Sequence, residues 1–192
     1  MMVGLRIVIV GVPGVGKSTV VEKAKEAVPG STVQVFGTAM FDEALRLKWV
    51  KHRDQMRKLP VAKQKKLQEA AASRISRGKG KVVFIDTHLF IRTPEGFWPG
   101  LPLRVIEPMK PTHLLLVVAS PKEILARRRN DTTRYRDEIT EEEVDEELEL
   151  ARNFLSAASL VSGAPMAFVR NEEGKSEKAA KEIASIVRGA RA

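Results

Sequence analysis

A short apolar run that ends in a glycine-rich turn most constrains what this chain can fold into. Leu5 to Val10 is almost continuously apolar, which is typical of a strand buried on both faces of a parallel sheet. Glycine-rich residues 11–16 follow at once, and a helical pattern extends from Thr19 to Ala27 before Pro29-Gly30 ends it. A buried strand, a turn and a helix in this order predict an α/β unit.

Four further apolar runs of strand length predict the rest of the sheet. They cover residues 33–36, 82–86, 113–118 and 166–169, and helix-like sequence separates them. Five strands alternating with helices predict an α/β fold with a five-stranded parallel sheet flanked by helices, which binds ligands at the carboxyl ends of its strands. A chain of 192 residues has room for one such domain.

The glycine-rich turn carries a complete phosphate-binding motif, or P-loop. Residues 11–18 match G-x-x-x-x-G-K-[ST] between a strand and a helix, which is the context that this motif requires. Its backbone N–H groups can surround an anion at the positive end of a helix, whereas a turn that only packs helix on strand would not need the full pattern. Lys17 would reach the β- and γ-phosphates and Ser18 would bind Mg²⁺. The predicted ATP-phosphate site comprises Gly11, Val12, Pro13, Gly14, Val15, Gly16, Lys17, Ser18 and Thr19.

Asp86 ends the apolar run that starts at Val82, as the carboxylate of a Walker B element does. We expect it beside Ser18, where it would help to hold Mg²⁺ through water; a strand-end Asp can instead cap a helix. P-loops serve switches, motors and kinases. The chain has no N-K-x-D segment for guanine and no room for a motor's extra domain, so the sequence favours a small kinase.

A kinase for a small acceptor needs a second anion site and a way to exclude water. Residues 36–81 run through charged, amphipathic sequence without a strand, which predicts a helical excursion from the sheet. Arg53 and Arg57 are four residues apart in it and would share a helix face, either to hold a phosphate or as a solvated basic face. Five arginines between Arg127 and Arg136 resemble a lid, because they would repel one another without bound polyanions.

Thr140 and Glu143 form a capping box that starts a long helix to Ser162.

Composition narrows the class of protein further. The net charge of +9 should attract anions, and zero cysteines exclude a disulfide framework or a zinc-ribbon lid. No apolar run reaches the roughly 18 residues of a membrane span, and the first residues show no signal-peptide pattern, so we expect a cytoplasmic protein. With one Tyr, two Trp and seven Phe, the chain offers little aromatic surface for stacking bases, which disfavours nucleic acid as a partner.

Over nearly its whole length, the sequence resembles the archaeal-type adenylate kinases. The resemblance is carried by residues 11–17 (GVPGVGK), 36–40 (FGTAM), 53–59 (RDQMRKL), 86–88 (DTH), 93–102 (TPEGFWPGLP) and 127–137. It implies reversible, Mg²⁺-dependent transfer of a phosphoryl group from ATP to AMP, giving two ADP, on a P-loop core with a helical AMP-binding insertion and a short lid. Alternatives are a kinase for another nucleoside monophosphate or small molecule, and a nucleotide-dependent RNA-binding factor.

The resemblance also implies roles for individual residues. Arg128 would stack over the adenine of ATP, and Arg134 and Arg136 would close on the transferring phosphoryl group, with Lys17 and these three arginines as the catalytic set. The implied AMP-binding residues are Thr38, Met40, Arg53, Arg57, Thr87 and His88. The implied organisation is a core of residues 1–36, 80–126 and 137–192, an insertion of residues 37–79 and a lid of residues 127–136, in a cytoplasmic homotrimer.

Overall fold

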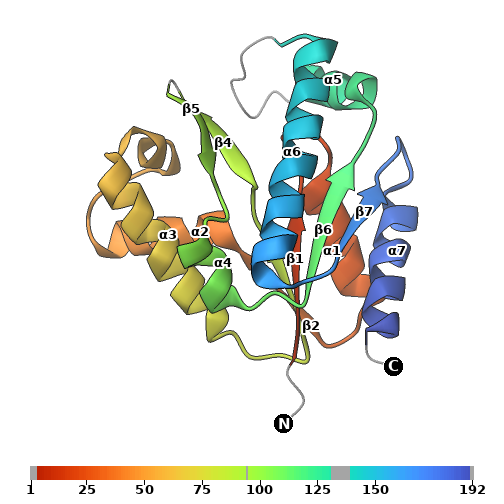
Figure 1. Ribbon diagram of the computed structural model, residues 1–192, viewed down its shortest axis with the longest axis horizontal. Helices are drawn as coiled ribbons and strands as arrows, with labels where there is room; N and C mark the ends of the chain where they lie inside the picture. Colours follow the sequence, from red (N-terminus) through yellow and green to blue (C-terminus); the bar gives the residue numbers. More distant parts are fainter. Residues whose placement is uncertain (1–3, 94, 131–138, 191–192) are drawn as a thin grey trace.

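A five-stranded parallel sheet lies at the centre of the computed structural model, which describes residues 4–93, 95–130 and 139–190 (Figure 1). The strand order is β2-β3-β1-β6-β7, and each neighbouring pair is parallel. This confirms the predicted fold class. The strands are β1 (Leu5–Val10), β2 (Ser31–Val35), β3 (Val82–Asp86), β6 (His113–Val118) and β7 (Met166–Arg170).

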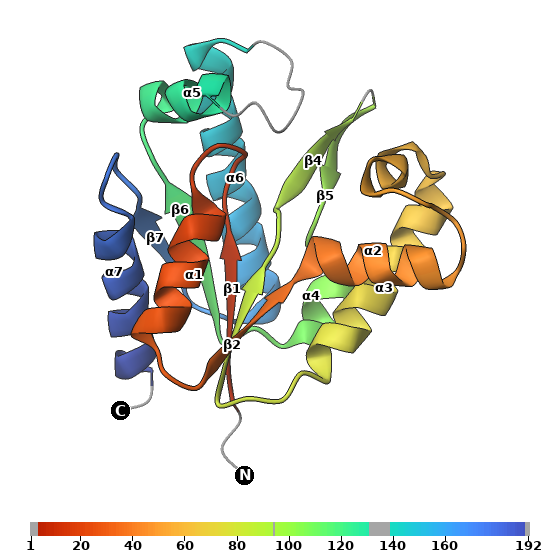
Figure 2. The same cartoon turned by 180° about the vertical axis from the view of Figure 1, so that it is seen from behind.

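Helices cover both faces of this sheet, which explains why its central strands are almost continuously apolar. One face carries α1 (Lys17–Ala27) and α7 (Ser176–Gly189), and the other carries α4 (Leu103–Met109) and α6 (Glu141–Ser162) (Figures 1 and 2). All five residues of β3 are buried. The register pairs Ile9 with Asp86, so β1 and β3 end side by side at the carboxyl edge.

Beyond the edge strand β2, the chain forms a helical segment of its own. It comprises α2 (Phe36–Arg46), the 3₁₀ helix η1 (Arg53–Lys58) and α3 (Val61–Ser76), and it lies to one side of the sheet (Figure 2). The predicted strand over residues 33–36 was wrong at its end, because Phe36 already begins α2. Ala44, Val50 and Leu67 are buried in a small apolar cluster of this segment, while other residues of α2 and α3, among them Ala39 and Ile75, are buried in the main core.

An antiparallel hairpin, which the strand pattern did not predict, stands beside the carboxyl edge (Figure 1). It pairs β4 (Phe90–Thr93) with β5 (Gly96–Pro99). The ring of Phe90 packs edge-on against Phe97, with centroids 5.1 Å apart, and against Phe154 of α6, at 5.6 Å. The contact with Phe154 fastens the hairpin to α6.

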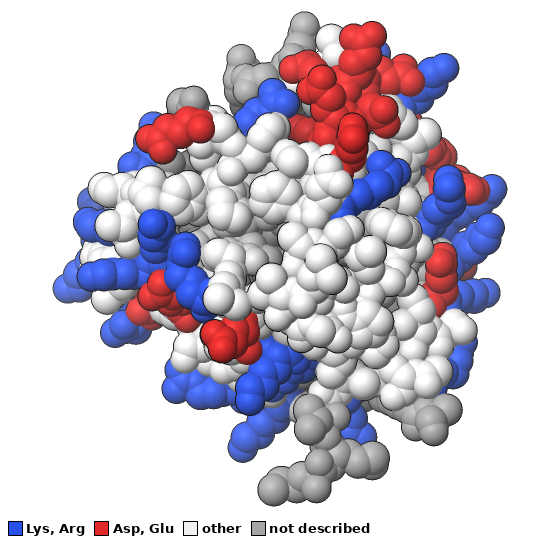
Figure 3. All heavy atoms as spheres, in the orientation of Figure 1, with Lys and Arg blue, Asp and Glu red and all other residues white. Residues whose placement is uncertain are grey.

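The long helix α6 begins as predicted. The Thr140 hydroxyl accepts the Glu143 backbone N–H at 3.2 Å, and the Glu143 carboxylate accepts the Thr140 backbone N–H at 2.9 Å. Acidic side chains gather over the start of this helix (Figure 3). In the described ranges, no helix combines the length and apolar character needed to cross a bilayer.

Candidate functional site

The glycine-rich loop between β1 and α1 forms the floor of the site. Gly14 and Gly16 both have φ +82°, a left-handed conformation that side chains disfavour. A Cβ on Gly14 would lie 2.7 Å from Cγ of Arg128, and one on Gly16 would collide with the amide of Asn171. Glycine is therefore required at both positions by backbone conformation and by close neighbours.

Lys17 and Asp86 form a buried ion pair at this loop. Lys17 is the first residue of α1 and Asp86 the last residue of β3, so the carboxyl edge brings together a buried ammonium and a buried carboxylate. Ser18 and Thr19, also in the first turn of α1, are exposed. The pair places Asp86 against Lys17, the residue before Ser18; the expected place of Asp86 beside Ser18 stays a prediction.

The donor set suits Mg²⁺. A hydroxyl and a carboxylate are hard oxygen ligands, and Mg²⁺ typically takes one or two protein ligands while phosphates and waters fill its octahedron. Among the described residues, no cluster of three or more His, Cys, Asp and Glu could form an all-protein metal cage. Ser18 and Asp86 therefore fit a cation that arrives with a nucleotide.

Two arginines of α5 (Pro121–Asn130) bind the backbone of the loop. Arg127 donates to the carbonyl oxygens of Val15, at 3.1 Å, and Asn171, at 3.0 Å. Arg128 donates from Nε to the carbonyl oxygen of Pro13 at 2.8 Å. The first part of the predicted lid is thus the end of a helix whose cations are held against the P-loop. Arg134 and Arg136 lie outside the described residues.

Asn171 is a residue of the candidate site that sequence reasoning missed. Its buried amide donates to the carbonyl oxygen of Val15 at 2.8 Å, while its own backbone N–H binds the carbonyl oxygen of Val118 at 2.8 Å. It thereby fastens the end of β7 to β6 and to the P-loop. The usable signal was its position, because it directly follows the last predicted strand of a parallel sheet.

The predicted AMP-binding residues lie in three places, on α2, in η1 and directly after β3. Thr87 and His88 directly follow β3; Thr87 is buried and its backbone N–H binds the carbonyl oxygen of Ile9 at 3.2 Å, whereas His88 is exposed. On α2, Met40 packs between the two apolar clusters and Thr38 is exposed. Its hydrogen bond places Thr87 at the carboxyl edge of the sheet. Thr38 instead lines a hollow between α2, α3 and β2.

Arg53 reaches the start of α2. Its guanidinium lies 2.8 Å from the place that a Cβ on Gly37 would take. No described side chain caps the first turn of α2, so backbone N–H groups and a guanidinium converge there, as in an anion site.

The spacing argument for Arg53 and Arg57 was wrong about helix type. Both lie in η1, a 3₁₀ helix with three residues per turn, in which positions four apart differ by about 120° around the axis. The α-helical spacing on which that argument depended therefore does not apply here. The side chain of Arg57 lies outside the described part of the structure.

Facing the loop, α6 and the hairpin add charged groups that sequence reasoning did not assign. Glu147 of α6 is buried and accepts a hydrogen bond from Arg128 at 2.6 Å. Arg92 of the hairpin approaches Glu143 at 3.6 Å and Glu147 at 3.9 Å, and lies over the ring of Phe97.

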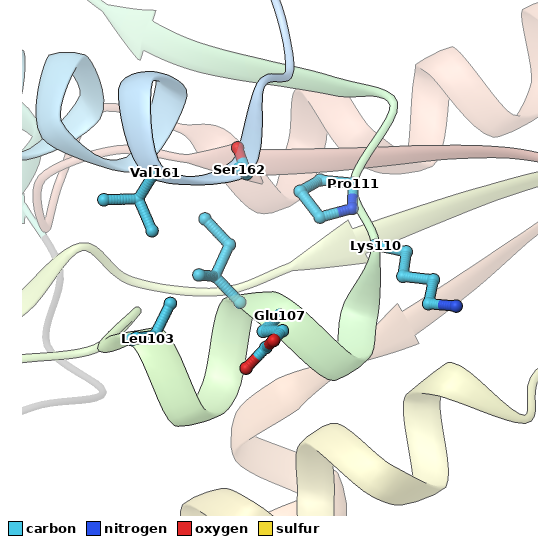
Figure 4. Close-up of a pocket in the computed structure, with 7 residues that line it drawn as sticks. Leu103, Glu107, Lys110, Pro111, Val161 and Ser162 are labelled. Carbon is cyan, nitrogen blue, oxygen red and sulfur yellow. The ribbon is translucent and has the colours of Figure 1, made fainter.

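A second hollow lies far along α6 from this site. It is formed between α4 and the end of α6, where the side chains of Leu103 and Val161 face each other (Figure 4). Its lining contains Glu107 and Lys110 but no residue of the P-loop, so it is not part of the candidate site.

Comparison with known proteins identifies the family. The AAA domain family matches residues 10–145. The adenylate kinase of Thermoplasma acidophilum is 43% identical over 183 residues, which cover 95% of this chain and 98% of that relative. That of Pyrococcus horikoshii is 40% identical over 184 residues, 94% of each chain. The chain belongs to the adenylate kinase family. The family resemblance predicted from the sequence motifs is thereby confirmed.

Solved structures agree on the fold of this adenylate kinase family member. A shikimate kinase from Acinetobacter baumannii in complex with shikimate superposes with a TM-score of 0.65, covering 97% of this chain and 94% of that one, at 14% identity. A shikimate kinase from Aquifex aeolicus gives a TM-score of 0.60 at 19% identity, covering 97% and 98%. At such low identity the likeness concerns the fold alone.

Proposed function

We propose that the protein catalyses reversible transfer of the γ-phosphoryl group of Mg·ATP to AMP, giving two ADP. The observation that carries this proposal is the buried Lys17–Asp86 pair at the mouth of a glycine-rich anion site. The acceptor is supported by curated relatives about 40% identical over nearly the full chain, each named adenylate kinase.

On the donor side, the loop would hold the ATP phosphates through its backbone N–H groups. Lys17 would leave its pairing with Asp86 in part and neutralise the β- and γ-phosphates, because an incoming polyanion attracts it more strongly than one carboxylate does. Ser18 and Asp86 would hold Mg²⁺, which supplies further charge neutralisation on the phosphates when bound. Arg128, already against the loop, would cover the adenine.

On the acceptor side, Arg53 would bind the AMP phosphate together with the N–H groups of α2. The convergence of its guanidinium on Gly37 supports this role. Arg57, Thr38 and Met40 from the same segment would complete the pocket, with Thr87 and His88 as its wall at the end of β3. We assign this segment, residues 37–79, as the AMP-binding insertion, and its separate apolar cluster supports that boundary.

The reaction requires no nucleophilic side chain. An oxygen of the AMP phosphate forms the new bond to the γ-phosphorus as the bond to the β–γ bridging oxygen breaks, and ADP leaves from each side. The protein's task is to position the two phosphates and neutralise charge that spreads over the transferring group. Lys17 would do so from the core, and Arg128, Arg134 and Arg136 from a lid of residues 127–136 that excludes water.

We also propose that the protein acts as a cytoplasmic homotrimer. Leu160 is 87% exposed and Val161 58% exposed at the end of α6, and Phe168 on the edge strand β7 is 44% exposed. The surface around this part of α6 carries few charged groups in Figure 3. Such apolar exposure supports contact between copies. Light scattering on the purified chain should give three times the monomer mass; a monomer mass would reject the trimer.

The proposed activity is tested by supplying Mg·ATP with AMP, CMP, UMP, GMP or shikimate and measuring ADP. We expect AMP to be preferred by about tenfold or more in kcat/KM, and EDTA to abolish transfer. Preference for another monophosphate, or for shikimate, would contradict the proposal.

A further inference from the structure

Glu147 is an unusual side chain for its place in the sequence. The first half of α6 is rich in acids, and Glu141, Glu142 and Glu146 are exposed there, whereas Glu147 is buried. Among the described residues, Lys17, Asp86 and Glu147 are the charged residues that are buried over backbone and side chain together. Lys17 and Asp86 form an ion pair at the P-loop. Burial of the Glu147 carboxylate likewise requires a partner that compensates its charge.

Its partner is Arg128. The guanidinium donates one hydrogen bond to Oε2 of Glu147, at 2.6 Å, and another to the carbonyl oxygen of Pro13, at 2.8 Å. The side chains of Arg128 and Glu147 are each 9% exposed. Two bonds to fixed acceptors, one on α6 and one on the P-loop, determine both the position of the guanidinium and the direction of its plane.

From this geometry we propose that Glu147 is a positioning residue that holds Arg128 across the mouth of the P-loop in the orientation that receives ATP. The inference rests on the proposed function, in which Arg128 contacts the nucleotide. The Pro13 carbonyl alone would fix one donor and leave the guanidinium free to rotate about it. The carboxylate removes that freedom before the nucleotide arrives, which lowers the entropy lost on binding.

The hairpin approaches the same carboxylate from its other oxygen. Arg92 lies 3.9 Å from Oε1 of Glu147 and is 47% exposed. The longer distance and the exposure make this the weaker contact. Arg128 is thus the main partner, and Arg92 fills the remaining side of the carboxylate.

A purely structural role for Glu147, joining α5 to α6, makes different predictions. It would lower stability and disturb binding of both substrates equally. A positioning role instead acts on ATP and only through Arg128, which a split between the two KM values can detect.

The first experiment compares Glu147→Gln with Glu149→Gln, an exposed acid two residues along the same helix. For Glu147→Gln we expect KM for ATP to rise about tenfold while KM for AMP stays within about twofold. Glu149→Gln should match the wild type, and Glu147→Asp should recover part of the ATP affinity because it retains the charge. An equal rise in both KM values, or no rise in KM for ATP, would overturn the inference.

A double-mutant cycle covers the case in which Glu147→Gln folds poorly. Glu147→Leu with Arg128→Leu removes both buried charges at once, so it leaves neither unpaired. If Glu147 acts through Arg128, the double variant should bind ATP as weakly as Arg128→Leu alone. A further loss in the Arg128→Leu background would show a separate role for Glu147 and overturn the proposal.

Binding of AMP-PNP, a non-hydrolysable ATP analogue, by calorimetry separates this inference from the proposed activity. Weaker AMP-PNP binding by Glu147→Gln supports the positioning role even if the wild type transfers no phosphoryl group to AMP. Unchanged AMP-PNP binding in a folded Glu147→Gln rejects it even if the wild type is an active adenylate kinase.

Discussion

The two sides of the P-loop are built in different ways. On the ATP side, Arg127, Arg128 and Asn171 all donate to backbone carbonyl oxygens of the loop. On the AMP side, Arg53 is exposed on a short 3₁₀ helix, in a segment that packs around its own small cluster. The proposed donor site is therefore held by hydrogen bonds to the loop itself, whereas the proposed acceptor site depends on a segment that packs partly around a cluster of its own and partly on the main core.

In a kinase, this difference implies that the two substrates are bound in different ways. A preformed ATP site would hold the phosphates in place beside the Lys17 ammonium that neutralises them. We expect the proposed AMP site to close when the acceptor binds, which would limit transfer to water. Substitutions on the two sides should accordingly change different kinetic constants.

The strongest test of the ATP side is Lys17→Ala. Removing the ammonium should lower kcat on the order of 10³-fold or more, because charge on the transferring phosphoryl group is no longer neutralised. A coupled assay of ADP formation measures the loss, and thermal unfolding checks that the fold survives the unpaired Asp86. Lys65→Ala in α3, where the lysine lies over the Trp98 ring, should remain nearly fully active. Comparable losses in both variants would refute the assigned geometry.

A pair of core substitutions tests whether the AMP side is a separate packing unit. Leu115 lies in the main core and Leu67 in the small cluster, and both are fully buried. Leu115→Ala should lower the free energy of unfolding by about 2–5 kcal/mol. Leu67→Ala should instead speed hydrogen exchange mainly within residues 37–79 and raise KM for AMP. Faster exchange in β1 and β6 after Leu67→Ala would show that the two units unfold together.

The same contrast explains how much could be predicted from the sequence. The five strands and the capping box of α6 depend on local patterns, namely apolar runs and the spacing of Thr140 and Glu143, and both predictions are confirmed. The hairpin was missed because each strand has only four residues, too few for a periodic pattern. The 3₁₀ form of η1 was missed because charged residues at spacing four suit an α-helix equally well.

Long-range polar contacts were less accessible to sequence reasoning. Arg127 and Val15 are 112 residues apart in the chain and Asn171 and Val15 are 156 apart, and periodicity reports burial but not which charged groups meet. A usable signal did exist for Glu147. It stands three residues after Val144 and four before Ala151, so helical spacing places it on the buried stripe of α6. The roles of individual site residues, including those of the arginines beyond residue 130, stay predictions.

The AMP side is tested directly by Arg53→Ala. Loss of a charge-assisted contact to the phosphate should raise KM for AMP about 10- to 100-fold, with KM for ATP nearly unchanged. Steady-state kinetics with each substrate varied in turn measures both constants. Lys51→Ala, an exposed cation two residues earlier, is the matched control. An equal rise in KM for ATP would erase the distinction between the two sides.

The smallest expected effect concerns the pH dependence of stability on the ATP side. Glu123 of α5 accepts hydrogen bonds from the hydroxyl of Ser120, at 2.7 Å, from its backbone N–H, at 3.0 Å, and from the backbone N–H of Glu173, at 2.6 Å. These bonds, that from the Ser120 hydroxyl foremost, hold the pKa of the Glu123 carboxyl below its ordinary value of 4.5. The carboxylate thus ties α5 to the loop after β7, and both elements contact the P-loop.

Because this pKa is lower in the folded protein than in the unfolded chain, the carboxylate stabilises the fold at pH values above about 4.5. That contribution is lost as pH falls through the lowered pKa, where the folded state also takes up the proton. Glu123→Gln removes the titrating group, so its melting temperature should be lower than that of the wild type at neutral pH and should fall less steeply on acidification. Thermal unfolding at a series of pH values from about 7 down to about 3.5 measures both slopes. As a control, Glu26→Gln alters an exposed acid on α1 and should retain the wild-type dependence of melting temperature on pH. If Glu123→Gln retains this dependence too, the Glu123 carboxylate does not fasten α5 in the way that these hydrogen bonds indicate.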